Sequence, residues 1–254
     1  MHRSFSYTLL ITWVLISFAC KTPVVLTSTS ARNIEVTEDI NPVDSQLIHI
    51  YLPYKNILEK DMSRVISYSE NEMIKAKPES SLTNFLADVL LEEGTIEAQK
   101  AGLDFKPQIS FVNYTGIRAS LPKGDITVEN IFELMPFENE MVFVEFKGEQ
   151  LQEFLDLIAS NGGDAVGGIR FVISKNKAKD VVIDGERLVP GNNYWMVTND
   201  YIADGGDNME VFKRKVAIVK TDVKIRDAFI SNLEKRQSRE EKLNVELDGR
   251  VTNE

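Results

Sequence analysis

The chain has few of the residues that bind metal ions or cross-link small folds. Its 254 residues contain one cysteine, Cys20, and two histidines, His2 and His49. A single cysteine cannot form a disulfide within the chain, and so few thiols and imidazoles argue against a zinc site. The sequence also lacks a Gly-rich phosphate loop ending in Lys and Ser or Thr, and it offers no Ser, His and Asp set for a catalytic triad. We therefore expect no metal ion and no cofactor in this chain, and a structural role for His49.

Positive charge is also scarce. The chain has 29 Lys and Arg residues against 39 Asp and Glu residues, a net charge of −10. Binding to the phosphate backbone of nucleic acid needs clustered Lys and Arg, so nucleic acid is not an expected partner. A small anionic ligand remains compatible with this composition if basic side chains gather at one pocket, and the acidity otherwise serves solubility.

The one long apolar run lies at the N-terminus, in "MHRSFSYTLLITWVLISFAC". It covers about 10 residues after a basic start, which is shorter than the roughly 20 residues that span a bilayer. We therefore expect residues 1–19 to be a cleaved secretion signal. Cys20 stands where a bacterial lipoprotein receives its lipid, although Ser17 occupies a position where leucine is usual. This pattern favours a protein anchored by lipid to a membrane surface of the bacterial cell envelope, periplasmic or on the outer membrane, and a plain cleaved signal is the alternative.

The remaining sequence predicts a tether over residues 20–44 and one folded domain over residues 45–254. The tether is rich in Thr, Ser and Pro and shows little periodicity. Within the domain, segments with helical and strand periodicity are mixed, which predicts an α/β fold with helices covering a mixed sheet system. The clearest helix is "ESSLTNFLADVLLEEG", with Ser80 or Ser81 as its N-cap. A hairpin is predicted at Asp184 and the following glycine, and a last helix is predicted to follow Thr221.

Three short stretches carry side chains suited to a ligand. "NYTGIR" follows a predicted strand and places Asn113 and Arg118 at its carboxyl end, where ligands of α/β folds often bind. "LMPFENE" places Phe137 in a loop, and "TNDYIADGGDN" places Tyr201 and Asp207 around a pair of glycines. Each has a simpler interpretation: a surface charge, a loop residue packed on the core, a tight turn. The residues alone leave both interpretations open.

Four longer segments occur in a fixed order. They are "SSLTNFLADVL", the block from Asn113 to Phe146 with its "GDIT" and "PF" elements followed by "KGEQL", then "GGIRFVIS", and then "VVIDGERLVPGNNYWMVTNDYIADGGDNMEVF". In this order they closely resemble the C-terminal domain of 5′-nucleotidases and UDP-sugar hydrolases over residues 45–235. The resemblance implies a four-layer α/β/β/α fold of the 5′-nucleotidase C-terminal domain type.

The resemblance also implies a role for each candidate residue. In that family this domain holds the nucleoside between two aromatic rings, which Phe137 and Tyr201 match. Asn113 matches an asparagine that contacts the base, and Arg118 matches an arginine that contacts ribose or phosphate. Asp207 matches an aspartate that accepts hydrogen bonds from the sugar hydroxyls. Such a set is chemically coherent, since stacking contributes about 1–3 kcal/mol per base and a carboxylate and a guanidinium suit the polar groups.

The sequence departs from the family at several positions. Tyr114 and Thr115 stand where the family has glycines, which reshapes the pocket beside Asn113. A further family arginine is expected near Ala76, where the flanking Lys75 and Lys77 could supply charge without bidentate geometry. The largest departure concerns catalysis. The family's hydrolytic domain needs metal ligands spread over a whole domain, and the predicted tether of residues 20–44 is too short to hold one.

We therefore expect no catalytic residue in this chain and no hydrolysis by this chain alone. The hypothesis is a substrate-binding half of a split 5′-nucleotidase in nucleotide catabolism, with nucleoside or nucleotide as ligand. A separate metallophosphatase would supply the divalent metals. The alternative is a non-enzymatic surface module that binds nucleosides or another partner.

Overall fold

The computed structural model describes residues 29–33 and 44–254. The predicted signal peptide, the predicted lipidation site at Cys20 and most of the predicted tether lie outside these residues. The chain divides into two compact units between His49 and Ile50. None of the helices in the described ranges is long and apolar enough to cross a bilayer.

The described part of the first unit is short. Residues 29–33 are exposed and have no regular secondary structure, and residues 44–49 contain the beginning of helix α2, Ser45–Met62. The carboxylate of Asp44 accepts a hydrogen bond from the backbone N–H of Gln46 at 2.9 Å, which satisfies one of the unpaired donors at the start of a helix. Helix α2 continues into the second unit and contains no buried residue.

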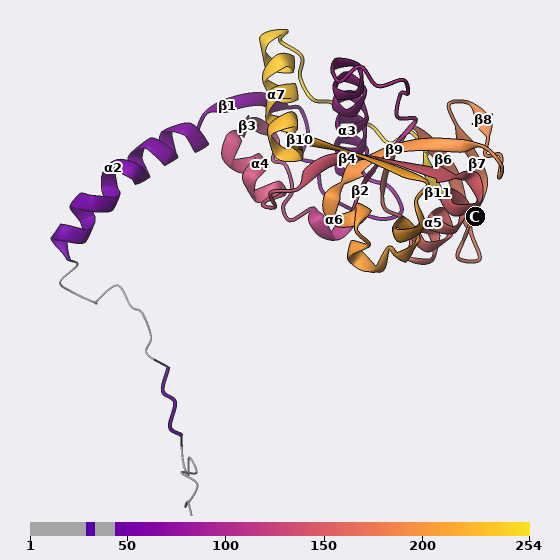
Figure 1. Ribbon diagram of the computed structural model, residues 1–254. Helices are drawn as coiled ribbons and strands as arrows, with labels where there is room; N and C mark the ends of the chain where they lie inside the picture. The colour runs from indigo at the N-terminus through magenta and orange to yellow at the C-terminus, as the bar shows by residue number, and fades with distance from the viewer. Residues whose placement is uncertain (1–28, 34–43) are drawn as a thin grey trace, which may run out of the picture. The chain divides into compact units, whose positions relative to one another are not determined.

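A mixed five-stranded sheet organises the second unit and sets the position of the site (Figure 1). Its strands, in order across the sheet, are β10 (Ala217–Lys224), β4 (Glu140–Lys147), β9 (Asn193–Asn199), β2 (Ile109–Val112) and β5 (Ala165–Gly167). Strands β9 and β2 are parallel, and the other neighbouring pairs are antiparallel. The chain therefore leaves β2 and β9 at the same edge of the sheet, and β4 begins at that edge.

Two helices, α3 (Ser81–Lys100) and α7 (Ile225–Ser238), lie on one side of this sheet (Figure 1). Helix α3 begins at the N-cap Ser80, whose hydroxyl accepts from Thr83 N at 3.1 Å while Ser80 N donates to the Thr83 hydroxyl at 2.9 Å. Phe85 of α3 and Phe229 of α7 meet edge to face with ring centroids 6.4 Å apart. These contacts join the two helices over the buried residues of β2 and β4.

Smaller elements complete this side of the sheet. Strands β1 (Val65–Ser69) and β3 (Gly124–Thr127) form an antiparallel pair, and helix α4 (Val128–Leu134) follows β3 directly. The N-cap of α4 is Thr127, whose hydroxyl accepts from Asn130 N. Helix α4 ends just before the loop that carries Phe137, so its position fixes where that loop starts.

A four-stranded sheet lies on the other side, with helix α5 (Gly148–Ser160) between the two sheets. Its strands, in order, are β11 (Val251–Asn253), β6 (Ile169–Ser174), β7 (Lys177–Ile183) and β8 (Glu186–Arg187). Helix α5 contacts both β4 and β7. Its buried residues Leu151, Phe154 and Ile158 share one apolar core with residues of both sheets.

The mixed α/β fold is confirmed, as are the N-cap at Ser80 and the hairpin turn at Asp184. The order of the four layers stays a prediction, and α5 contacts strands of both sheets. The predicted start of the last helix was wrong. Residues 217–224 form β10 and the helix begins at Ile225, because this β-branched segment pairs with β4.

Gly168 joins β5 to β6 with a left-handed φ of +72°, and a Cβ there would lie 2.0 Å from the carbonyl oxygen of Gln108. Gly185 also has a left-handed φ, +83°, but a Cβ there would meet nothing within 4 Å. We expect Gly185→Ala to destabilise by about 1–2 kcal/mol from backbone strain alone. Gly168→Ala should cost about 1–3 kcal/mol more, from overpacking. Urea unfolding of both variants tests this, and equal losses of stability would contradict the steric argument.

Candidate functional site

Three loops meet at the sheet edge where β2 and β9 end and β4 begins. The first follows β2 and contains Asn113 and Arg118, and the second connects α4 to β4 and contains Phe137. The third follows β9 and includes the short helix α6 (Asp200–Ala203), which carries Tyr201, and the turn that carries Asp207. Parallel pairing of β2 with β9 brings the first and third loops together, and antiparallel pairing of β4 with β9 brings the second. The sheet topology thus collects residues that are far apart in the sequence.

The loops line a cavity of about 320 Å³ that opens to solvent. Its lining residues are Asn113, Thr115, Gly116, Arg118, Phe137, Asn139, Tyr201 and Asp207. The five residues that the sequence proposes for ligand binding therefore line one cavity, of a volume that suits a small organic ligand. Their roles in binding remain predictions.

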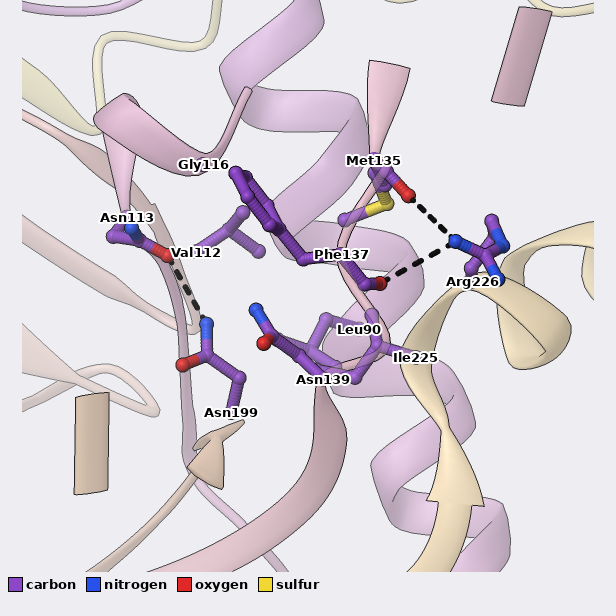
Figure 2. Close-up of a pocket in the computed structure, with 10 residues that line it drawn as sticks. All are labelled: Leu90, Val112, Asn113, Gly116, Met135, Phe137, Asn139, Asn199, Ile225 and Arg226. Carbon is purple, nitrogen blue, oxygen red and sulfur yellow. Dashed lines mark hydrogen bonds between the residues drawn. The ribbon is translucent and has the colours of Figure 1, made fainter. Parts of the chain in front are cut away.

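A second, much smaller cavity, of about 20 Å³, shares four of these residues and extends under the Phe137 loop (Figure 2). The guanidinium of Arg226, at the start of α7, donates to the carbonyl oxygens of Met135 at 3.2 Å and Phe137 at 3.5 Å, as Figure 2 shows. Arg226 also pairs with Glu138 and lies 4.0 Å from the ring centroid of Phe132. Arg226 is only 6% exposed and holds the loop from beneath. Phe137, on the same loop, is 48% exposed.

The third loop is built around the ring of Tyr201. The Tyr201 hydroxyl accepts from Asp207 N at 3.1 Å and donates to Asp207 Oδ1 at 3.0 Å. A Cβ at Gly206 would lie 2.4 Å from the Tyr201 ring, and Gly205 has a left-handed φ of +93°. The two glycines therefore allow the chain to pass under Tyr201 and turn, and they present Asp207, which itself has a left-handed φ of +53°, to the cavity.

Asn113 is 4% exposed, and both its oxygen and its nitrogen are hydrogen-bonded within the protein. Its Oδ1 accepts from Asn199 Nδ2 at 3.0 Å, and its Nδ2 donates to Thr115 Oγ at 2.9 Å and to Asp207 Oδ2 at 2.7 Å. A Cβ at Gly116 would lie 2.9 Å from Asn113 Oδ1, so the retained glycine makes room for this carboxamide. Asn113 thus ties the first and third loops together.

Arg118 is exposed and lies in the cavity wall. Its backbone N–H donates to the carbonyl of Leu134 at 2.9 Å, which fixes the base of the side chain beside α4. The guanidinium makes one long hydrogen bond, to the carbonyl of Thr115 at 3.4 Å, so most of its donors remain available. Among the residues lining this cavity, Arg118 carries the positive charge.

The two lysines near the expected family arginine support the first loop from behind. Lys75 Nζ donates to the carbonyl oxygens of Ile117 at 2.7 Å and Tyr114 at 3.3 Å, and Lys77 Nζ donates to the carbonyl of Asn161 at 2.7 Å. Both ammonium groups lie over the Tyr114 ring, at 4.5 and 4.9 Å from its centroid. Burial, with the positive charge of Arg118 nearby, lowers the pKa of Lys75.

Asp164, just before β5, anchors the same loop. Its Oδ1 accepts from the backbone N–H groups of Tyr114 and Ala165, both at 2.8 Å. Burial, with a smaller contribution from the negative charge of Asp207, raises the pKa of Asp164 to about 7, against the opposing effects of these hydrogen bonds and of Lys77. A carboxyl group that titrates near neutral pH therefore supports the backbone of the cavity wall.

Sequence reasoning missed three contributors. Asn139 lines both cavities and was not proposed, although it stands two residues after Phe137. Arg226 and Asp164 hold loops from other elements, and no local pattern marks such a partner. Within the described residues, no group of three or more His, Cys, Asp or Glu side chains is arranged to hold a metal ion.

The profile of the family described as 5′-nucleotidase, C-terminal domain, matches residues 63–214, more than half of the chain. The chain belongs to the 5′-nucleotidase C-terminal domain family. The match contains all five proposed site residues and every loop that lines the larger cavity. Helix α2 precedes the matched region and α7 follows it.

Curated relatives are similar over part of their length. The trifunctional nucleotide phosphoesterase protein YfkN of Bacillus subtilis is 30% identical over 181 residues, which are 63% of this chain and 12% of the relative. The protein UshA of Escherichia coli is 28% identical over 142 residues, 53% of this chain and 25% of the relative. The chain therefore spans a quarter or less of these two proteins.

Solved structures show the same fold. A 5′-nucleotidase precursor from Thermus thermophilus matches with a TM-score of 0.67 and 26% identity, over 84% of this chain and 44% of that one. The NAD nucleotidase of Haemophilus influenzae matches with a TM-score of 0.61 and 17% identity, over 83% of this chain and 41% of that one. At 17% identity, the similarity to the NAD nucleotidase shows the fold alone.

The raised pKa of Asp164 makes the stability of this protein depend on pH. The folded state retains the Asp164 proton between about pH 4 and pH 7, where the unfolded state releases it, so this group's contribution to the free energy of unfolding falls as pH rises through that window. Asp164→Asn cannot ionise and still offers an oxygen to both N–H groups. We expect the stability of Asp164→Asn relative to the wild type to increase between pH 5 and pH 8, measured by urea unfolding.

A matched control is Asp125→Asn, at an exposed position of β3. Its stability should follow that of the wild type at both pH values. If Asp164→Asn behaves as this control does, Asp164 is ionised in the folded protein at pH 5 and the argument from burial is wrong.

Proposed function

We propose that this chain binds a nucleoside or nucleotide as the specificity half of a split 5′-nucleotidase in nucleotide catabolism, and that a separate metallophosphatase performs the hydrolysis. The observation that carries the proposal is the single cavity in which two half-exposed aromatic rings, Phe137 and Tyr201, come from different loops. An exposed aromatic ring in a rigidly held loop loses contact with solvent when a flat base covers it. Membership of the family supports this ligand class.

The polar groups of the cavity suit the rest of such a ligand. Asp207 presents a carboxylate that can accept from a sugar hydroxyl, and Arg118 presents guanidinium donors that suit a phosphate or ribose oxygen. Asn139 supplies a carboxamide at the cavity wall that can both donate to and accept from a base edge. Because Asn113 is buried and its carboxamide joins two loops, we propose that Asn113 positions the loops and that Asn139 contacts the base.

We propose a partner because the curated relatives extend well beyond the segments that match this chain. The curated relatives above are four or more times longer than the matched segments, and one of them is named a nucleotide phosphoesterase. Helix α2 lies directly before the matched region and exposes apolar side chains, among them Ile50, Tyr54 and Ile57 at helical spacing. We propose that this face of α2 contacts the metallophosphatase. The lipid predicted at Cys20 would hold the pair at a membrane surface of the cell envelope.

Aromatic stacking predicts how binding responds to substitution. Phe137→Ala and Tyr201→Ala should each weaken binding of adenosine or AMP about tenfold or more, since stacking contributes about 1–3 kcal/mol per base. Calorimetric titration of the full chain measures this. The matched control is Tyr54→Ala, which removes an exposed aromatic ring outside the cavity and should leave the affinity unchanged. Absence of binding by the wild-type chain at millimolar ligand would refute the proposed function.

The proposed metallophosphatase partner leads to a prediction about phosphate release. Phosphate release from AMP by a metallophosphatase that lacks its own binding domain should rise when the full chain is added, and the chain alone should release none. Ile57→Asp on α2 should reduce this stimulation without changing the affinity of the chain for AMP. Stimulation that is absent with the wild-type chain, despite nucleoside binding, would favour the alternative of a non-enzymatic nucleoside-binding module.

A further inference from the structure

We infer that Thr115 leaves Asp207 able to accept only one further hydrogen bond, so that the cavity binds 2′-deoxynucleosides at least as well as ribonucleosides. A ribonucleoside offers an adjacent pair of hydroxyls at C2′ and C3′, and a 2′-deoxynucleoside offers one of them. The inference rests on the proposed function and names the substrate class of the same cavity.

The orientation of the side chains around Asp207 is fixed by a series of hydrogen bonds that starts at α6 (Asp200–Ala203). Asn199 is the N-cap of α6, and its Oδ1 accepts from Ile202 N at 2.8 Å. Its Nδ2 therefore faces Asn113 and donates to Asn113 Oδ1 at 3.0 Å. The Nδ2 of Asn113 must then face the opposite way, toward Thr115 and Asp207.

That orientation decides where the Thr115 hydroxyl sends its hydrogen. Asn113 Nδ2 donates to Thr115 Oγ at 2.9 Å, so the hydroxyl oxygen acts as an acceptor toward Asn113. The hydroxyl hydrogen is then directed at Asp207 Oδ2, with which Thr115 makes a short hydrogen bond. Asp207 Oδ2 also accepts from Asn113 Nδ2 at 2.7 Å, so two donors already occupy this oxygen.

The other oxygen of Asp207 is partly used as well. A carboxylate offers about four acceptor positions, two on each oxygen. Asp207 Oδ1 accepts from the Tyr201 hydroxyl at 3.0 Å. One position on Oδ1 remains for a ligand.

The carboxylate cannot easily rotate to present another face. The backbone N–H of Asp207 donates to the Tyr201 hydroxyl at 3.1 Å, and the ring of that tyrosine lies against Gly206. Two adjacent sugar hydroxyls are best bound when one donates to each carboxylate oxygen. With Oδ2 occupied, the second hydroxyl of a ribose loses its acceptor, so it contributes little to affinity.

Of the three donors to Asp207, Thr115 can be removed with the least disturbance. Asn113 is buried and joins two loops, and Tyr201 forms the cavity wall, whereas Thr115 is exposed. Glycine at position 115 would release one position on Oδ2 and leave the other two donors in place. The specificity for the sugar is therefore expected to depend on the hydroxyl of residue 115.

The experiment measures dissociation constants of the full chain for adenosine and 2′-deoxyadenosine, and for uridine and 2′-deoxyuridine, by calorimetric titration. For the wild type we expect the two members of each pair to bind within about threefold of each other. For Thr115→Gly we expect the ribonucleoside to be favoured by about tenfold, which corresponds to about 1.4 kcal/mol, because its second hydroxyl regains a carboxylate acceptor. Thr115→Ser keeps the hydroxyl and should retain the wild-type ratio.

A second variant tests whether the sugar preference depends on the carboxylate of Asp207 or on the geometry of the loop. In Thr115→Gly combined with Asp207→Asn, the preference for the ribonucleoside should disappear, because the released acceptor is no longer a carboxylate. A tenfold ribonucleoside preference in the wild type, or an unchanged ratio in Thr115→Gly, would overturn the inference while nucleoside binding itself stands. Failure of the wild type to bind any of the four nucleosides would overturn the proposed function and the inference with it.

Discussion

The buried carboxamide of Asn113 is the interaction on which the site depends. A buried amide must satisfy its donors and its acceptor, and Asn113 does so with three residues: Asn199, Thr115 and Asp207. Asn199 in turn caps α6, so the start of that helix, the end of β2 and the turn that carries Asp207 are held in one network. Loss of the Asn113 carboxamide would leave the buried Nδ2 of Asn199 without this partner.

The residues of the site fall into two groups: some hold the loops in place, and others face the cavity. Asn113, Asp164 and Arg226 are buried and hold loops, and the ring of Phe137 and the guanidinium of Arg118 are exposed at the cavity wall. Precise placement of groups that meet a ligand requires other groups that are locked by packing and hydrogen bonds. Arg226 belongs to α7, and Asn113 and Asp164 stand directly after β2 and directly before β5, so each supporting residue lies in or beside the sheet and its cover.

Much of the fold follows from periodicity, and part of the site does not. The capped helix at Ser80 and the turn at Asp184 depend on neighbouring residues, so local sequence predicts them. Strand β10 depends on pairing with β4, and the boundary with α7 could not be seen without that partner. The five cavity residues came from a resemblance that spans the domain. Arg226 could not be found in this way, because it acts through the Met135 and Phe137 carbonyls.

The parallel pairing of β2 with β9 has a consequence for how the protein acquires its site. Ile109 pairs with Met196, and the residues between them fold into β4, α5 and most of the four-stranded sheet. Closing so long a loop has an entropic cost that must be met before the pair forms, and such non-local contacts slow folding. The cavity therefore exists only once the whole sheet has assembled. A chain that ends before Asn193 lacks β9 and the third loop, and therefore has no cavity.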